Sequence, residues 1–193
     1  MKKSAATLIF LFTQLVVFGQ NKLLKDVDHD GITDTVYVDS AKHTIVCKLS
    51  SKNYHPISSK PIGILNVMSG VVETKNGFEF FNDWMRAGYK NQFRYNPKTK
   101  KIQLIGMSKY EFGNAVSDGS GESGVNLLTA DYIGNWNYFD TDKDKVIKIP
   151  TIRTKMKFGL INLEDFEEET YFGYSKRCAE LFYKHKKIKM NKK

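Results

Sequence analysis

Four aspartates near the start of the chain have the spacing of a loop that binds a hard cation. The motif reads Asp26-x-Asp28-x-Asp30-Gly31-x-x-Asp34. Oxygens from its first, third and fifth positions can converge on one ion, and glycine at the sixth position permits the sharp turn. Carboxylates packed this densely repel one another unless a cation lies between them. We therefore expect calcium here, bound directly or through water by Asp26, Asp28, Asp30, Asp34 and the backbone carbonyl of Ile32.

The loop departs from a helix–loop–helix calcium site at its twelfth position, where Tyr37 replaces the bidentate glutamate. The residues around it have the composition of strands rather than helices. A solvated acidic turn is the alternative to a calcium site. A weaker copy of the pattern, Asp140-x-Asp142-x-Asp144, has Lys145 where glycine is required. The sequence leaves open whether this second stretch holds an ion.

Motifs of catalytic sites are few. The sequence contains no His-Glu-x-x-His, no Gly-x-Ser-x-Gly and no glycine-rich phosphate loop, and its four histidines are scattered. A carboxylate pair for glycoside hydrolysis would have to come from Glu111, Asp118, Glu122 and Asp131, whose spacing alone brings no two together. We therefore expect a protein that is not an enzyme. A glycan-acting hydrolase and a structural envelope protein are the alternatives.

The N-terminal residues predict export. Lys2 and Lys3 precede an apolar run that ends at Phe18, and Gly19 is small enough to precede a cleavage point. The run is shorter than the roughly 20 residues that span a bilayer. We expect residues 1–19 to be a signal peptide, the mature chain to be periplasmic or secreted, and no segment to span a membrane.

The positive charge is concentrated at the C-terminus. The formal net charge is +9, yet residues 20–175 carry 20 basic and 20 acidic residues. From Lys176 onward there are eight basic residues and one acid. Because the body has no basic surplus, we expect no nucleic-acid partner. We expect residues 176–193 to be a basic helix or tail, dispensable for folding beyond Lys184, that either improves solubility or contacts an anionic polymer or acidic partner.

Most of the chain between these ends has the pattern of strands and turns. The 13 Phe, 10 Tyr and 2 Trp residues favour sheets. Alternation predicts strands at 35–38, 44–49, 62–72, 77–84, 92–95, 101–105, 125–129, 136–139, 146–149 and 156–161. Helices are expected only at 163–170 and 175–187. The predicted fold class is mainly β, with antiparallel hairpins forming a small propeller-like or sandwich domain over residues 20–175 and a short C-terminal helix.

The clearest hairpin turns at Asn96 and Pro97, so that Phe93 and Tyr95 face Ile102 and Leu104. Two cysteines, Cys47 and Cys178, lie far apart in the sequence. Export would permit a disulfide, but buried free thiols are equally common in strand cores. The sequence leaves their pairing open.

A loop rich in glycine and serine is expected at 113–124, between two strand regions. Binding residues gather on loops of rigid scaffolds. Tyr110 and Phe112 supply aromatic anchors there, and Asp118 and Glu122 supply acids. We expect these four residues to contact a protein partner. A turn that contacts nothing is the alternative.

The acidic loop, followed directly by the strand at 35–38, resembles the calcium loops of FG-GAP and similar β-repeat proteins. In general layout, the signal peptide, this loop and the hairpin turn at 95–99 resemble bacterial periplasmic lysozyme inhibitors of propeller-like fold. The resemblance implies a bound calcium and a role as an inhibitor or immunity protein, which plugs the cleft of a cell-wall-degrading enzyme such as a muramidase. The resemblance identifies no inhibitory residue in this chain. We expect the protein to be a monomer.

Overall fold

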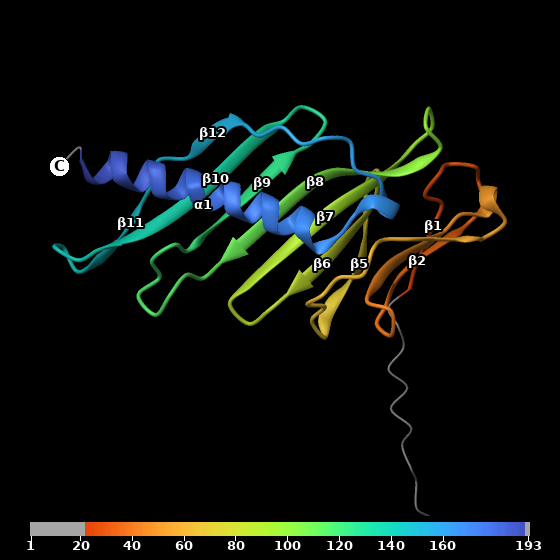
Figure 1. Ribbon diagram of the computed structural model, residues 1–193, viewed down its shortest axis with the longest axis horizontal. Helices are drawn as coiled ribbons and strands as arrows, with labels where there is room; N and C mark the ends of the chain where they lie inside the picture. The colour runs from red at the N-terminus through yellow and green to blue at the C-terminus, as the bar shows by residue number, and fades with distance from the viewer. Residues whose placement is uncertain (1–21, 192–193) are drawn as a thin grey trace, which may run out of the picture.

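The computed structural model describes residues 22–191, which form two antiparallel sheets and one long helix (Figure 1). The expected signal peptide at 1–19 lies outside the described residues. Among the described residues, no helix has the length and hydrophobicity that a membrane span requires.

The N-terminal sheet has four strands that pair in chain order. They are β1 (Leu23–Lys25), β2 (Asp34–Asp39), β3 (Thr44–Lys48) and β4 (Pro56–Ser58). A short 3-10 helix, η1 (Ser50–Lys52), follows β3. The first four residues of β3 are all buried, whereas β2 alternates between buried and half-buried positions. The strand β3 is therefore covered on both faces, as expected of an interior strand.

The large sheet has eight strands and is built as a meander of hairpins. They are β5 (Met68–Thr74), β6 (Gly77–Asp83), β7 (Ala87–Asn96), β8 (Lys101–Glu111), β9 (Gly121–Asn126), β10 (Asp131–Asp140), β11 (Lys145–Lys148) and β12 (Ile152–Lys155). The last two strands share the outer edge of β10: β12 pairs with residues 131–134, and β11 pairs with residues 137–140.

One helix, α1 (Glu168–Met190), runs across one face of the large sheet (Figure 1). Its buried residues recur every three or four positions and so form one stripe: Tyr171, Tyr174, Cys178 and Phe182. The ring of Tyr171 stacks on Tyr89 of β7 with 3.8 Å between centroids, and Phe182 meets Trp136 of β10 edge-on at 6.3 Å. Aromatic packing therefore fixes α1 on the sheet along much of its length.

The segment that leads into α1 belongs to the same core. After the short helix η2 (Leu163–Asp165), Phe166 packs edge-on against Phe93 and Phe80, at 5.4 and 6.5 Å between ring centroids. Buried residues of both sheets and of α1 form one continuous cluster. The first two strands of the small sheet contact β5, so the core passes from one sheet to the other.

The prediction of a mainly β, antiparallel fold is confirmed, and the two sheets form the sandwich-like alternative. The C-terminal helix is longer than the sequence indicated, with 23 residues. The sequence predicted two helices, at 163–170 and 175–187, but the packed stripe on either side of Gly173 outweighs the low helix propensity of glycine and makes one helix.

Several strand boundaries differ from the prediction. The segment 156–161 forms no strand, and β12 occupies 152–155 instead. Its apolar residues are explained by packing, because Met156 is buried and Phe158 lies 4.6 Å from the guanidinium of Arg177. The strand expected from residue 62 begins only at Met68, after a turn.

The loop expected at 113–124 ends at Ser120, because residues 121–126 form β9. Pairing with β8 on one side and β10 on the other outweighs the weak strand propensity of this segment. At Gly121 the backbone has φ +146°, and a Cβ atom would lie 2.1 Å from the carbonyl oxygen of Asn135. Glycine is therefore required at this crossing.

Candidate functional site

The acidic loop between β1 and β2 brings three of the predicted ligands together. One carboxylate oxygen from each of Asp26, Asp28 and Asp34 lies within 4.8 Å of the other two. The backbone turns sharply between them, since His29 and Gly31 have φ values of 64° and 86°. The glycine of the motif thus has the left-handed conformation that its position requires.

Asp34 closes the loop from its far end. It is fully buried, and its two oxygens accept hydrogen bonds from the backbone amides of Val27 (2.7 Å) and Ser50 (2.8 Å). These bonds tie the loop to η1. Each oxygen of an ionised carboxylate has a further lone pair that a cation can use.

Asp26 and Asp28 each direct one oxygen to a protein donor and leave the other without one. The Oδ2 of Asp26 accepts from the amide of Gly31 at 3.0 Å, and the Oδ2 of Asp28 accepts from the hydroxyl of Ser51. Both Oδ1 atoms are buried and have no hydrogen-bond partner among the described residues. Such atoms are costly unless something neutralises them. The donor set therefore fits a hard cation such as calcium.

Asp30 and Ile32 lie in the same turn, outside the cluster of three. The carboxylate of Asp30 is exposed and accepts from the amide of Ile32 at 2.8 Å and from the hydroxyl of Ser50 at 2.6 Å. These hydrogen bonds stabilise the turn, as aspartate side chains commonly do.

The second acidic stretch has a different arrangement. Asp140 is 3% exposed, accepts from the amide of Asp142 at 3.2 Å and lies 3.8 Å from the ammonium of Lys143. Within residues 22–191, the acidic oxygens that converge closely enough to hold a metal ion are those of the first loop. Asp140, Asp142 and Asp144 do not form such a cluster.

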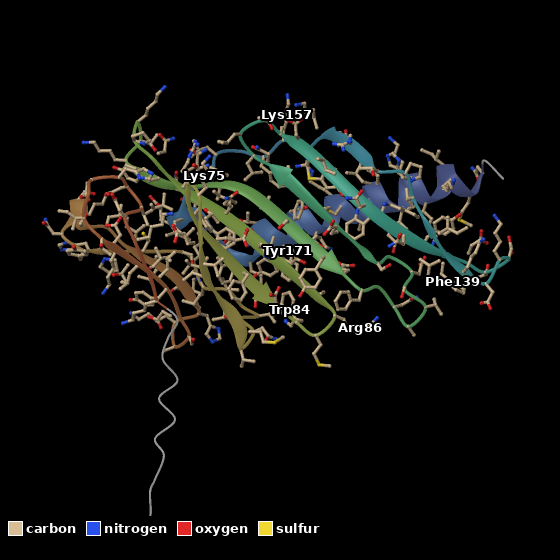
Figure 2. The ribbon with its side chains drawn as sticks, turned by 180° about the vertical axis from the view of Figure 1, so that it is seen from behind. Lys75, Trp84, Arg86, Phe139, Lys157 and Tyr171 are labelled. Carbon is tan, nitrogen blue, oxygen red and sulfur yellow. The ribbon has the colours of Figure 1, made fainter. Side chains whose placement is uncertain are left out.

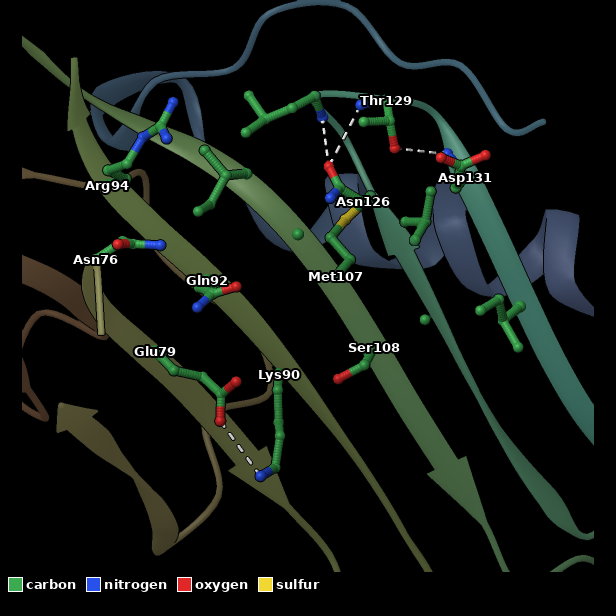
Figure 3. Close-up of a pocket in the computed structure, with 16 residues that line it drawn as sticks. Asn76, Glu79, Lys90, Gln92, Arg94, Met107, Ser108, Asn126, Thr129 and Asp131 are labelled. Atoms are coloured by element: carbon green, nitrogen blue, oxygen red, sulfur yellow. Dashed lines mark hydrogen bonds and ion pairs between the residues drawn. The ribbon is translucent and has the colours of Figure 1, made fainter. Parts of the chain in front are cut away.

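The face of the large sheet opposite α1 is open, as Figure 2 shows from behind. Because strand side chains alternate, Lys90, Gln92 and Arg94 lie on this face, while the intervening residues of β7 lie in the core. A shallow pocket of about 660 Å³ occupies it (Figure 3). Its polar lining residues come from β6 to β10 and their turns: Asn76, Glu79, Lys90, Gln92, Arg94, Ser108, Asn126, Thr129 and Asp131.

Small residues form the floor of this pocket. Gly106 of β8 and Gly124 of β9 both line it, and a Cβ atom at either would meet its nearest neighbour at 3.5 Å or more. A second pocket of about 350 Å³ shares Lys90, Ser108 and Gly124 with the first. The two pockets therefore form one concave surface, which we call the open face.

The structure places three of the four predicted partner-binding residues at one end of the open face. Tyr110 of β8 and Glu122 of β9 are register partners, and both line the second pocket. Phe112 is 53% exposed, and its ring centroid lies 5.7 Å from that of Tyr110. Phe112 therefore extends the aromatic surface beyond the end of β8.

Asp118 is not part of this group. Its carboxylate accepts two hydrogen bonds from the ammonium of Lys186, at 2.9 and 3.0 Å, and one from the amide of Phe139 at 2.8 Å. Partial burial acts to raise the pKa of Asp118, but the hydrogen bonds and the charge of Lys186 outweigh it and hold the pKa below its ordinary value. Asp118 thus ties the β8–β9 loop to α1. Lys186 lies beyond Lys184, in the region that the sequence predicted to be dispensable for folding. Its contact with Asp118 attaches part of that region to the sheet domain.

We expect Asp118→Asn to lower the free energy of unfolding by about 1 kcal/mol near neutral pH, the upper range for a partly exposed pair. Because the pKa is lower in the folded state, this contribution is complete above the unfolded pKa of about 3.9 and is lost as the pH falls through the folded value. Urea unfolding of the variant and the unchanged protein, near neutral pH and again at a pH below the folded pKa of Asp118, measures this difference in stability. Asp144→Asn, which changes an exposed aspartate of the β10–β11 turn, is the control. Equal losses for the two variants at neutral pH would contradict the assignment.

Three of the four carboxylates considered for glycoside hydrolysis are paired with lysines. Glu111 pairs with Lys109, Asp118 with Lys186, and Asp131 with Lys155. The hydrogen bond from Lys155 also lowers the pKa of Asp131. A general acid needs a raised pKa, so Asp118 and Asp131 are poorly suited to that role. Glu122, the fourth, is exposed on the open face.

The two cysteines are buried free thiols. Cys47 lies in β3, and Cys178 lies in α1 with its sulfur 3.4 Å from the hydroxyl of Ser123. Burial raises the pKa of both thiols. They are consequently unreactive core residues.

Comparison of the chain with protein-family models, with curated proteins and with solved structures gave no match. Apart from Tyr110 and Glu122, the sequence did not predict the residues of the open face, since polar residues spread over several strands make no motif. The available signal was the alternation of Lys90, Gln92 and Arg94 with residues that proved to be buried or half-buried.

Proposed function

We propose that the mature chain is an exported, non-enzymatic binding protein, stabilised by calcium, that receives a macromolecule on its open face. Export rests on the pattern of residues 1–19. The calcium rests on the two buried, unpartnered oxygens of Asp26 and Asp28. The observation that carries the binding role is the continuous concave surface formed by the two pockets.

The open face presents polar, charged and apolar side chains to a partner. Its floor is made of Gly106, Ser108 and Gly124, and charges of both signs surround it; Lys90 and Glu79, for example, pair at 3.2 Å (Figure 3). Small-molecule sites are usually enclosed and mostly apolar. A wide, shallow surface that mixes polar and apolar residues is more typical of contact with another macromolecule.

The sharpest form of the proposal is inhibition of a cell-wall-degrading enzyme such as a muramidase. Tyr110 and Phe112 offer adjacent aromatic anchors, and Glu122 offers a carboxylate beside them. Aromatic residues dominate the energy of many interfaces, and an acid complements a cationic cleft.

Calcium would act by fixing the small sheet on the large one. Lys25, which immediately precedes the acidic loop, donates to the carboxylate of Glu73 at 2.6 Å and to the carbonyl of Thr74 at 2.8 Å, at the end of β5. A cation bound to Asp26 and Asp28 would hold the neighbouring backbone in the conformation that makes this contact.

The test is a cell-wall lysis assay with a panel of muramidases, including any encoded beside the gene for this chain. We expect the mature protein to inhibit at least one enzyme at near-equal molar amounts. The double variant Tyr110→Ala, Glu122→Ala should lose most of this inhibition, because it removes an anchor and the adjacent acid.

The matched control is Tyr183→Ala, Glu180→Ala, which removes an exposed tyrosine and glutamate from α1. It should inhibit as well as the unchanged protein. Absence of inhibition across the panel would reject the muramidase form of the proposal. Equal inhibition by both double variants would remove Tyr110 and Glu122 from the binding surface.

A further inference from the structure

A lysine-rich pocket lies between the β10–β11 hairpin and the C-terminal end of α1. Its volume is about 510 Å³. Within residues 22–191, its lining consists of Lys143, Lys145, Lys148 and Lys189 together with Tyr138, Val146 and Ile147. This end of the molecule lies opposite the end that carries β1 and β2 (Figure 1), so the pocket is separate from the calcium loop.

The positive charge of the pocket is only partly balanced nearby. Lys143 lies 3.8 Å from Asp140, which is almost fully buried behind it. Asp142 and Asp144 belong to the same turn but do not line the pocket. Three further lysines line the same space, Lys145, Lys148 and Lys189, and none of the described residues that line it is acidic.

Helix stabilisation explains only one of these three. Basic residues in the last turn of a helix offset its dipole, and Lys189 lies in the last turn of α1. Lys145 and Lys148 lie on β11, an outer strand that has no such dipole. Their charges lie beside those of Lys143 and Lys189 in the lining of one pocket, and an anionic ligand would relieve the repulsion among these ammonium groups.

We propose that this pocket binds a ligand that carries phosphate groups, held by Lys145, Lys148 and Lys189. Ammonium groups bind phosphate as point charges. The pocket has room for more than a single phosphate ion, and Val146 and Ile147 offer apolar contact beside the charges. The same chemistry occurs in soluble compounds with several phosphates and in phospholipid headgroups. The proposal is independent of the role given to the open face.

The test uses the mature chain and two probes. Calorimetry at low salt measures binding of inorganic pyrophosphate, and co-sedimentation measures binding to phosphatidylcholine vesicles with and without phosphatidylglycerol. We expect binding to at least one anionic probe, weakened by added salt. The double variant Lys145→Gln, Lys189→Gln should lose at least about tenfold in affinity, since two charged contacts disappear.

The control is Lys75→Gln, Lys98→Gln, which removes the same charge from exposed turns at the opposite end of the large sheet; Figure 2 labels Lys75 far from Phe139 of β10. It should bind as the unchanged protein does. Pyrophosphate binding alone would indicate a soluble ligand, and binding to vesicles only when phosphatidylglycerol is present would indicate a headgroup. No binding to either probe, or equal losses in the two double variants, would overturn the proposal.

Discussion

Tyr174→Ala should lower the free energy of unfolding by about 3–5 kcal/mol, the range for removing a large aromatic side chain from a core. The side chain is fully buried between α1 and β9, and its hydroxyl lies 2.8 Å from that of Ser123. Truncation would leave a cavity and remove the tyrosine partner of the buried Ser123 hydroxyl. Because small proteins have only about 5–15 kcal/mol of stability, we expect α1 to detach at low urea concentrations.

Two further variants separate the causes of this loss. Tyr174→Phe keeps the ring and removes the hydrogen bond, so we expect it to cost only about 1 kcal/mol. Tyr183→Ala removes an exposed tyrosine from the same helix and should change stability by less than about 0.5 kcal/mol. Urea unfolding followed by circular dichroism measures all three. If Tyr174→Ala cost no more than Tyr183→Ala, the packing of α1 on the sheet would be wrong.

Calcium should raise the melting temperature of the mature chain by about 5–10 °C relative to a chelator. At a hundredfold excess over the dissociation constant, a ligand of the native state contributes about 2.7 kcal/mol. For a chain of this size, each kcal/mol shifts the melting temperature by about 2–4 °C. The double variant Asp26→Asn, Asp28→Asn should abolish the shift. It removes the negative charge of the two carboxylates whose Oδ1 atoms have no hydrogen-bond partner among the described residues.

The same experiment distinguishes lost binding from a damaged fold. In chelator, the double variant should melt no lower than the unchanged protein, since it relieves repulsion within the cluster. The control Asp144→Asn should keep the calcium shift. A shift that persists in the double variant but disappears in Asp144→Asn would locate the ion in the β10–β11 turn instead.

Local signals predicted the hairpins well. The turn residues Asn96 and Pro97 and the alternating apolar residues gave the β7–β8 register correctly, since Phe93 lies opposite Leu104 and Tyr95 opposite Ile102. The spacing of the acidic loop likewise placed Asp26, Asp28 and Asp34 in one cluster. In both cases the interacting residues are close in sequence, so the local residue spacing is enough to predict how they are arranged in space.

Features that depend on distant packing were not predictable. Asp118 is an acid in a loop rich in glycine and serine, which suggested contact with a partner protein. It instead pairs with Lys186 of α1, which lies 68 residues away in the sequence. The polar residues of the open face become a surface only when β6 to β10 pair side by side. The length of α1 was also hidden, because the aromatic residues that hold it lie in the sheet.

The central claim is that the open face receives the partner, and filling its floor tests this most directly. Gly106→Gln, Gly124→Gln adds two long neutral side chains where a Cβ meets nothing closer than 3.5 Å, so the sheet should remain intact. The control Gly173→Gln adds one on α1, where a Cβ has no neighbour within 4 Å. All three proteins are immobilised, and capture of partners from an envelope extract is quantified by mass spectrometry. We predict a specific partner that the unchanged protein and Gly173→Gln retain and the double variant loses. Retention of that partner by the folded double variant would contradict the claim.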